Sequence, residues 1–292
     1  MTPTEQTTEK KSKRKKTATY HEAAFAAFNY LLRKYKHNGD VELFDEHRLS
    51  KRSLKIDIMV VKKNPAVEIE ESWGKIFREH NVIEYKSPVA KPVSLDVFNK
   101  VIHGYTGIYA SNENISLTQM TATIVCFKKP TALFEQLKSE LNYKILRKDK
   151  GIYYISIKGS CESKSLLIQF LVSDELEDSV VVLKALRAKI DETTAKKVLE
   201  LPVEDDEYQV SLSQWWEVML LENREILSEE ENMGRWEDVV NTLERKGILD
   251  KWSQKKKQDW QREGMQQGMQ KMLDLLKNGI SIADAEKMIL AR

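Results

Sequence analysis

The sequence has 292 residues, of which 41% are hydrophobic and 32% are charged, and its formal net charge at pH 7 is +2. This composition is typical of globular proteins and excludes fibrous and wholly disordered chains. No stretch approaches the roughly 18 apolar residues that cross a bilayer, and the N-terminus lacks the apolar segment of a secretion signal, so we expect a cytoplasmic protein that is not bound to a membrane.

The first 18 residues are polar and rich in lysine. They include the dense basic run KKSKRKK from Lys10 to Lys16. We interpret residues 1–18 as a disordered basic tail, which either only keeps the chain in solution or adds weak, salt-sensitive affinity for polyphosphate. From Tyr20 to Lys36 the apolar residues recur at helical spacing, which predicts an amphipathic helix.

Three short strands are predicted next. Each contains apolar residues, largely β-branched or aromatic, and is bounded by polar or turn-forming residues. The three segments are Val41–Glu46, Ser53–Lys62 and Asn81–Lys86. The stretch 67–77 between the last two strands fits no single type of element. We therefore expect a helix followed by three consecutive strands in the first part of the chain.

Charged residues interrupt two of these strands at positions where burial is expected. Asp57 stands inside the largely apolar stretch KIDIMVV. In the following strand Glu84 and Lys86 are separated by one residue, and because side chains alternate along a strand, they share one face. A carboxylate without a partner in a buried strand is destabilising, so these positions favour a function over a purely structural role.

Helices and strands alternate through the next part of the sequence. We predict a helix over Ser94–Tyr109, a buried strand over Thr121–Phe127 and a helix over Pro130–Leu141. Two more strands follow at Ile152–Ile157 and Leu166–Val172. This pattern predicts an α/β fold with a mixed central sheet of up to six strands, flanked by helices.

The C-terminal part of the sequence is predicted to be mainly helical. We divide it into a helical region over 176–255 and a helical tail over 256–292. Together they contain five tryptophans, which we interpret as helix-packing residues. The repeat EGMQQGMQ in this tail places two glycines one helical turn apart. Glycine inside a helix lowers helix stability by about 1 kcal/mol relative to alanine. We therefore expect the tail to be stabilised by contacts with a partner, for example in a homodimer.

Asp57, Glu84 and Lys86 are the residue types that hydrolysis of a phosphodiester requires. The reaction needs a cation that neutralises charge on the phosphoryl oxygens and a water molecule activated near neutral pH. Mg²⁺ prefers oxygen ligands and keeps several waters, so two carboxylates and one backbone carbonyl are enough to hold it. A lysine on the same face can orient the attacking water or stabilise the developing charge.

This arrangement, an acid in one strand and Glu-Tyr-Lys in the next, resembles the PD-(D/E)XK nuclease superfamily. The order of elements over about residues 20–130 is similar to that family's restriction-endonuclease-like core, which we expect to lie in a domain over residues 19–175. The phrase GKIFREHNVIEYKSP and the EGMQQGMQ tail are similar to the bacterial transposase-like, recombination-promoting branch. The sequence departs from the family at Ile56, where a proline usually precedes the first acid.

The resemblance implies a role for each residue of the site. Asp57, Glu84 and the backbone carbonyl of Tyr85 would bind Mg²⁺, for which Mn²⁺ can substitute. Lys86 would act on the attacking water, and Glu22 in the first helix would complete the site. The implied function is that of a metal-dependent endodeoxyribonuclease that hydrolyses DNA, linked to mobile elements or recombination.

Alternative interpretations remain for the site and for the whole chain. Glu22 is equally well explained as an exposed residue in the first turn of a helix, where negative charge is favourable. A catalytically silent nuclease-like fold could serve as a DNA- or protein-binding module. A third possibility is a helical scaffold that assembles through the C-terminal half of the chain.

Other chemistries find little support in the sequence. Cys126 and Cys161 have neither metal-ligand spacing nor further cysteines with which to build a disulfide framework, which indicates a reducing compartment. The sequence has no serine nucleophile elbow and no phosphate-binding glycine loop. Covalent hydrolase chemistry and nucleotide cofactors are therefore not expected.

Overall fold

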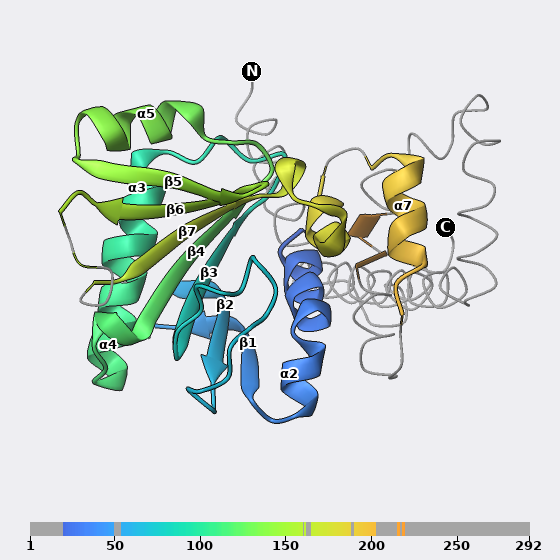
Figure 1. Cartoon of the computed structure of the whole chain (residues 1–292), viewed down its shortest axis with the longest axis horizontal. Coiled ribbons are helices and arrows are strands. Elements are labelled where there is room, and N and C mark those ends of the chain that lie inside the picture. The colour runs from blue at the N-terminus through green and yellow to red at the C-terminus, as the bar shows by residue number, and fades with distance from the viewer. Residues whose placement is uncertain are drawn as a thin grey trace, which may run out of the picture. The chain divides into compact units, whose positions relative to one another are not determined.

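The structure is a computed structural model, and its first described residue lies in the first predicted helix (Figure 1). It describes residues 20–49, 54–159, 161, 165–187, 190–202, 215, 216, 218 and 219. All of these belong to one compact unit. The predicted basic tail over 1–18, most of the helical region over 176–255 and the whole tail over 256–292 lie outside the described residues, so the predicted domain boundaries remain predictions.

Seven strands form one mixed sheet in the order β1-β2-β3-β4-β7-β6-β5 (Figure 1). Their bounds are β1 Val41–Arg48, β2 Lys55–Lys62, β3 His80–Lys86, β4 Met120–Cys126, β5 Tyr143–Asp149, β6 Ile152–Ile157 and β7 Leu167–Val172. The central strands β3, β4 and β7 are mutually parallel, whereas all other neighbouring strands are antiparallel. The predicted α/β class with a mixed central sheet is therefore confirmed.

Strand β5 was missed by the sequence prediction, which allowed for six strands. Its sequence YKILRKD exposes three basic residues, Lys144, Arg147 and Lys148. The strand lies at the edge of the sheet and pairs only with β6. Charged side chains are common on edge strands because they discourage pairing with other chains. The alternation of apolar and polar residues is consequently weak, although the segment forms a complete strand.

Helices precede, connect and follow the strands. Residues 20–31 form the first helical segment, and they are followed by α2 (Arg33–His37). A continuous helical stretch connects β3 to β4 and consists of α3 (Leu95–Asn99), the π-helix η1 (Lys100–Tyr105) and α4 (Thr106–Glu113). The remaining helices are η2 (Leu117–Gln119), α5 (Thr131–Ser139), η4 (Ser173–Glu175), η5 (Asp178–Val180), α6 (Val181–Lys184) and α7 (Glu192–Leu199).

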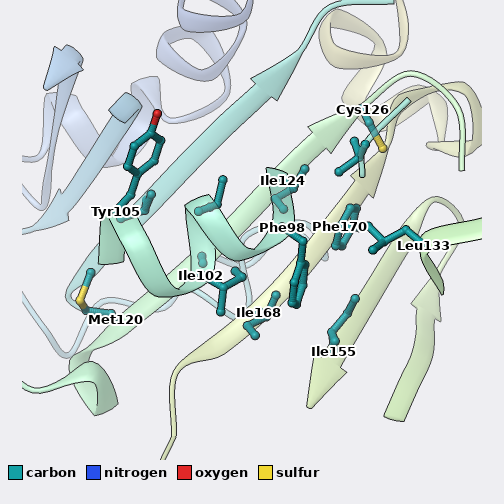
Figure 2. Packing of buried hydrophobic residues seen from close by; sticks show 14 of the residues in the cluster. Phe98, Ile102, Tyr105, Met120, Ile124, Cys126, Leu133, Ile155, Ile168 and Phe170 are labelled. Carbon is teal, nitrogen blue, oxygen red and sulfur yellow. The ribbon is translucent and has the colours of Figure 1, made fainter. Parts of the chain in front are cut away.

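A hydrophobic core joins one face of the sheet to the helical stretch 95–113 and to α5. Figure 2 shows Phe98 and Ile102 of this stretch over Ile124 of β4 and Phe170 of β7. The rings of Phe98 and Phe170 are stacked with their centroids 6.4 Å apart. Complete burial of a large apolar side chain contributes about 1.5–3 kcal/mol. This packing fixes the helical stretch over the face of β3 that carries Val82 and, two residues later, Glu84.

Polar side chains of the sheet anchor the long connection between β2 and β3. Asn81 Nδ2 donates hydrogen bonds to the carbonyls of Val60 (3.2 Å) and Arg78 (2.7 Å), and Asn81 Oδ1 accepts one from the Arg78 N–H (2.9 Å). Gln169 Nε2 donates to the carbonyl of Trp73 at 3.0 Å. The stretch 67–77, which fits no single element in the sequence, is therefore attached to the sheet by hydrogen bonds to side chains.

The described part of the C-terminal helical region packs against the first helical segment. The Tyr30 hydroxyl donates a hydrogen bond to the Pro202 carbonyl at 2.9 Å. Trp215 and Trp216 are buried, and the indole N–H of Trp215 donates to the Val182 carbonyl at 3.2 Å. The predicted packing role of these two tryptophans is confirmed, whereas the other three lie outside the described residues. Among the described residues, no helix is long and apolar enough to cross a membrane.

Candidate active site

Strands β2 and β3 bring Asp57 and Glu84 to opposing positions. Their antiparallel register pairs Ile58 with Ile83, so the next position along the two strands sets Asp57 against Glu84. Side chains at opposing positions of antiparallel strands point to the same face, with Cβ atoms about 4.5–5.5 Å apart in regular pairs. The two carboxylates therefore share one face of the sheet, the face that the helical stretch 95–113 covers.

The backbone pairing of β2 and β3 ends at Ile58 and Ile83, and beyond it the Asp57 side chain forms the next hydrogen bond between the two strands. Asp57 Oδ2 accepts a hydrogen bond from the Tyr85 N–H at 2.9 Å. Within a strand, the N–H and C=O groups of one residue face the same neighbouring strand. The Tyr85 carbonyl is therefore on the β2 side, together with the carboxylates. On the other side of β2, the pairing with β1 skips Glu46, whose φ is 46°.

Lys86 neutralises only part of the Glu84 carboxylate. Lys86 Nζ donates to Glu84 Oε1 at 2.6 Å, and the Lys86 side chain is 25% exposed whereas that of Glu84 is 5% exposed. The second oxygen, Glu84 Oε2, is buried and has no hydrogen-bond partner. Because leaving a buried acceptor unpaired costs about 1–3 kcal/mol, and more for a charged group, this oxygen is a candidate ligand atom.

The electrostatics of the pair follow from burial and from the repulsion of like charges. Burial and, to a smaller extent, the nearby charge of Asp57 raise the pKa of Glu84 to about 7, although Lys86 opposes this shift. Burial likewise raises the pKa of Asp57, against the opposing effects of the Tyr85 N–H, of the Lys86 charge and of a hydrogen bond with the Glu84 side chain. Two carboxylates this close are rarely both ionised unless a cation compensates them. The pair can therefore hold a proton near neutral pH or a divalent cation.

Lys100 in η1 is a further cation near the carboxylates, and the sequence analysis missed it. Its hydrogen bond with Tyr105 and, to a smaller extent, the charges of Glu84 and Asp57 raise the pKa of Lys100. A lysine on an amphipathic helix is ordinarily a solvated surface residue, so its sequence position carried no signal. Only the packing of the helical stretch on the sheet brings Lys100 near the site.

Among the described residues, Glu22 forms no hydrogen bond or ion pair with this group of charges. It is an exposed residue of the first helical segment. The strongest charges acting on Asp57 and Glu84 are those of Lys86, Lys100 and, for Glu84, Asp57, and Glu22 is not among them. Its catalytic role remains a prediction.

No metal centre built from several side chains is found in the described part of the chain. No group of three or more His, Cys, Asp or Glu side chains there is arranged to hold an ion. Two carboxylates and a carbonyl form a smaller ligand set, which suits a cation that keeps several of its waters.

Comparisons of the chain with protein-family models, with curated proteins and with solved structures found no match. These comparisons therefore show no family. The functional interpretation depends on the chain's own residues, above all on the opposed carboxylates of β2 and β3.

Proposed function

We propose that this chain is a Mg²⁺-dependent endodeoxyribonuclease of the PD-(D/E)XK type, with Asp57, Glu84 and Lys86 at its reaction centre. The observation that supports this most directly is the pair of opposed carboxylates, the half-buried Asp57 and the buried Glu84, whose oxygen Oε2 has no hydrogen-bond partner. Burying two such groups destabilises the fold unless a proton or a cation compensates them. Strongly shifted carboxyl pKa values are typical of functional sites.

The order of elements supports the same proposal. The first helical segment, β1, β2, β3, the helical stretch 95–113 and β4 follow one another in the order expected for a restriction-endonuclease-like core. Strands β3 and β4 are parallel and joined by a helical crossover, as parallel neighbours require. We propose this core as the catalytic part, DNA as its substrate and the C-terminal helices as the means of forming a homodimer.

The residues of the site fit a hard divalent cation. Glu84 and Asp57 would supply carboxylate oxygens and Tyr85 a carbonyl oxygen, which are the ligand types that Mg²⁺ and Mn²⁺ accept. When bound, such an ion polarises a phosphoryl oxygen and lowers the pKa of a coordinated water. The unpartnered Glu84 Oε2 is the atom that gains most from this ligation, because it has no hydrogen bond to lose.

Lys86 supplies the positive charge at the same face. Its ammonium pairs with Glu84 Oε1, and its side chain is 25% exposed. A divalent ion held by Glu84 would compete with the Lys86 ammonium for the same negative charge. Lys86 itself can orient the attacking water or stabilise charge on the phosphate.

A plasmid-nicking assay with purified protein tests the proposal. We expect wild-type protein to convert supercoiled DNA to nicked circles with Mg²⁺ or Mn²⁺ and to be inactive in EDTA. Asp57→Asn and Lys86→Ala should each lower the rate by about 10²–10⁴-fold. Glu113→Gln removes an exposed carboxylate from α4 and should retain the wild-type rate.

Two outcomes would count against the proposal. If Asp57→Asn and Lys86→Ala cleave as fast as wild type, the activity comes from a contaminating enzyme and the catalytic assignment is wrong. If the protein binds DNA tightly but never cleaves it, the catalytically silent binding module is the better interpretation.

A further inference from the structure

The helical stretch above the carboxylates contains an irregular turn. Residues Lys100–Tyr105 form a π-helix, after which the Thr106 N–H bonds to the carbonyl of Val101, five residues earlier. The buried Thr106 hydroxyl donates to the Ile102 carbonyl within the same turn. π turns are rare and frequently occur at functional sites, because they re-aim side chains relative to a regular α-helix.

The π turn brings the side chains of Lys100 and Tyr105 together. In a regular α-helix, residues five apart lie about 140° apart around the axis, given 3.6 residues per turn. Here Lys100 Nζ is 4.9 Å from the centroid of the Tyr105 ring, within the range of a cation–π interaction. Figure 2 shows that Tyr105 extends from the helix in a different direction from Phe98 and Ile102, although all three are buried in the same core. The buried Tyr105 ring therefore restrains the Lys100 ammonium.

Lys100 acts on the carboxylates without forming an ion pair with them. Its charge lowers the pKa of Asp57 and of Glu84, although the larger effect of burial raises both. Lys86 contacts Glu84 directly, but among the ion pairs of the described residues none joins Lys100 to either carboxylate. A second ammonium is thus held near the pair, beyond contact distance.

We propose that Lys100 is a positioning residue that binds an oxygen of the substrate's phosphate group at the carboxylate pair. This inference rests on the proposed nuclease function. Lys86 forms an ion pair with Glu84, whereas among the described residues no ion pair joins Lys100 to either carboxylate, so the Lys100 ammonium can pair with an anion at the site. An ammonium forms charge-assisted hydrogen bonds to phosphate oxygens, and Tyr105 reduces the conformational freedom that Lys100 loses on binding.

Cleavage kinetics and Mn²⁺ binding of Lys100 variants test this role. The measurements are the KM and kcat for a short DNA duplex and the Mn²⁺ affinity by titration calorimetry. Lys91 is an exposed lysine in the segment before α3, so Lys91→Ala is the matched control. Should wild type not cleave, the Kd of the same duplex in Mn²⁺ takes the place of KM.

Lys100→Ala should raise KM, or that Kd, roughly tenfold, with kcat changed less than about threefold, because a phosphate contact is made in ground state and transition state alike. Its Mn²⁺ affinity should be unchanged or up to about threefold higher, since a neighbouring positive charge has been removed. Lys100→Arg should restore most of the substrate affinity. Lys91→Ala should match wild type in each measurement.

Wild-type KM or Kd in Lys100→Ala would overturn the inference. So would weaker Mn²⁺ binding, because it would mean that Lys100 only supports the carboxylate site. Thermal unfolding of each variant shows whether the fold is intact, and Lys100→Arg provides a second readout if the alanine variant unfolds. Failure of the proposed function gives a different pattern, in which wild type and Asp57→Asn bind Mn²⁺ equally.

Discussion

Two buried polar residues of β3, Asn81 and Glu84, differ in how completely their side-chain atoms are hydrogen-bonded. Asn81 is 0% exposed, and its amide bonds to backbone groups of Val60 and Arg78. Glu84 is 3% exposed, shares one oxygen with Lys86 and leaves the other without a partner, opposite a second carboxylate. Buried polar groups are normally hydrogen-bonded, so the first arrangement is the expected structural one. The arrangement at Glu84 instead leaves an oxygen to which a cation can bind. By this criterion Asn81 maintains the fold, whereas Glu84 serves a function.

The largest difference between the two residues should appear in the pH dependence of stability. Burial raises the pKa of Glu84 from 4.5 to about 7, so between these pH values the unfolded state releases a proton that the folded state keeps. The free energy of unfolding must then fall as the pH rises through this window, by about 3 kcal/mol. The raised pKa of Asp57 acts in the same direction.

Urea unfolding in EDTA at pH 4.5 and pH 8 measures this fall. Glu84→Gln cannot ionise and should lose most of the fall, whereas Glu113→Gln should follow wild type. Added Mn²⁺ should stabilise the wild-type protein at pH 8, because a ligand that binds only the folded state stabilises that state. It should have little effect on the stability of Glu84→Gln. If the free energy of unfolding of Glu84→Gln falls as steeply with pH as that of wild type, Glu84 is not the group that titrates, and the contrast with Asn81 is wrong.

The smaller stability effect should come from Asn81. Asn81→Ala removes the hydrogen bonds of the Asn81 amide with the Val60 carbonyl and with the Arg78 backbone, although the Arg78 N–H keeps its bond to Thr121 Oγ1. This loss should lower the free energy of unfolding by about 2 kcal/mol at every pH. Asn99→Ala, at an exposed position in α3, should change it by less than about 0.5 kcal/mol. Equal stability of Asn81→Ala and wild type in urea would mean that these hydrogen bonds do not hold the connection to the sheet.

The smallest effect is expected for Glu22. Because Glu22 is exposed and is not among the strongest charges acting on the carboxylates, Glu22→Gln should change the nicking rate by less than about threefold. The competing prediction, that Glu22 completes the site, requires a loss of roughly 10–100-fold or more. The nicking assay used for Asp57→Asn decides between the two.

The strands of the site could be predicted because charged residues are conspicuous in apolar strands. The alternation of side chains set Glu84 and Lys86 on one face, and their 2.6 Å ion pair agrees with that spacing. The α/β class followed from the alternation of helices and strands. These are local signals, since each is contained in a few neighbouring residues.

The register between β2 and β3 could not be predicted in this way. The connection between them runs over residues 63–79, and its position depends on distant partners such as Asn81 and Gln169. The role of Lys100 was hidden for the same reason, because it depends on a π turn and on packing across the sheet. Strand β5 was missed since an edge strand tolerates charges that disguise its alternation.

A crystal of the protein soaked in Mn²⁺, with the ion located by its anomalous scattering, tests most directly whether Asp57 and Glu84 share a divalent cation. The proposed site predicts a peak between the two carboxylates, with Glu84 Oε2 and the Tyr85 carbonyl among the ligand atoms. A soaked crystal in which Mn²⁺ occupies other acidic positions and leaves this pair without a peak would contradict it.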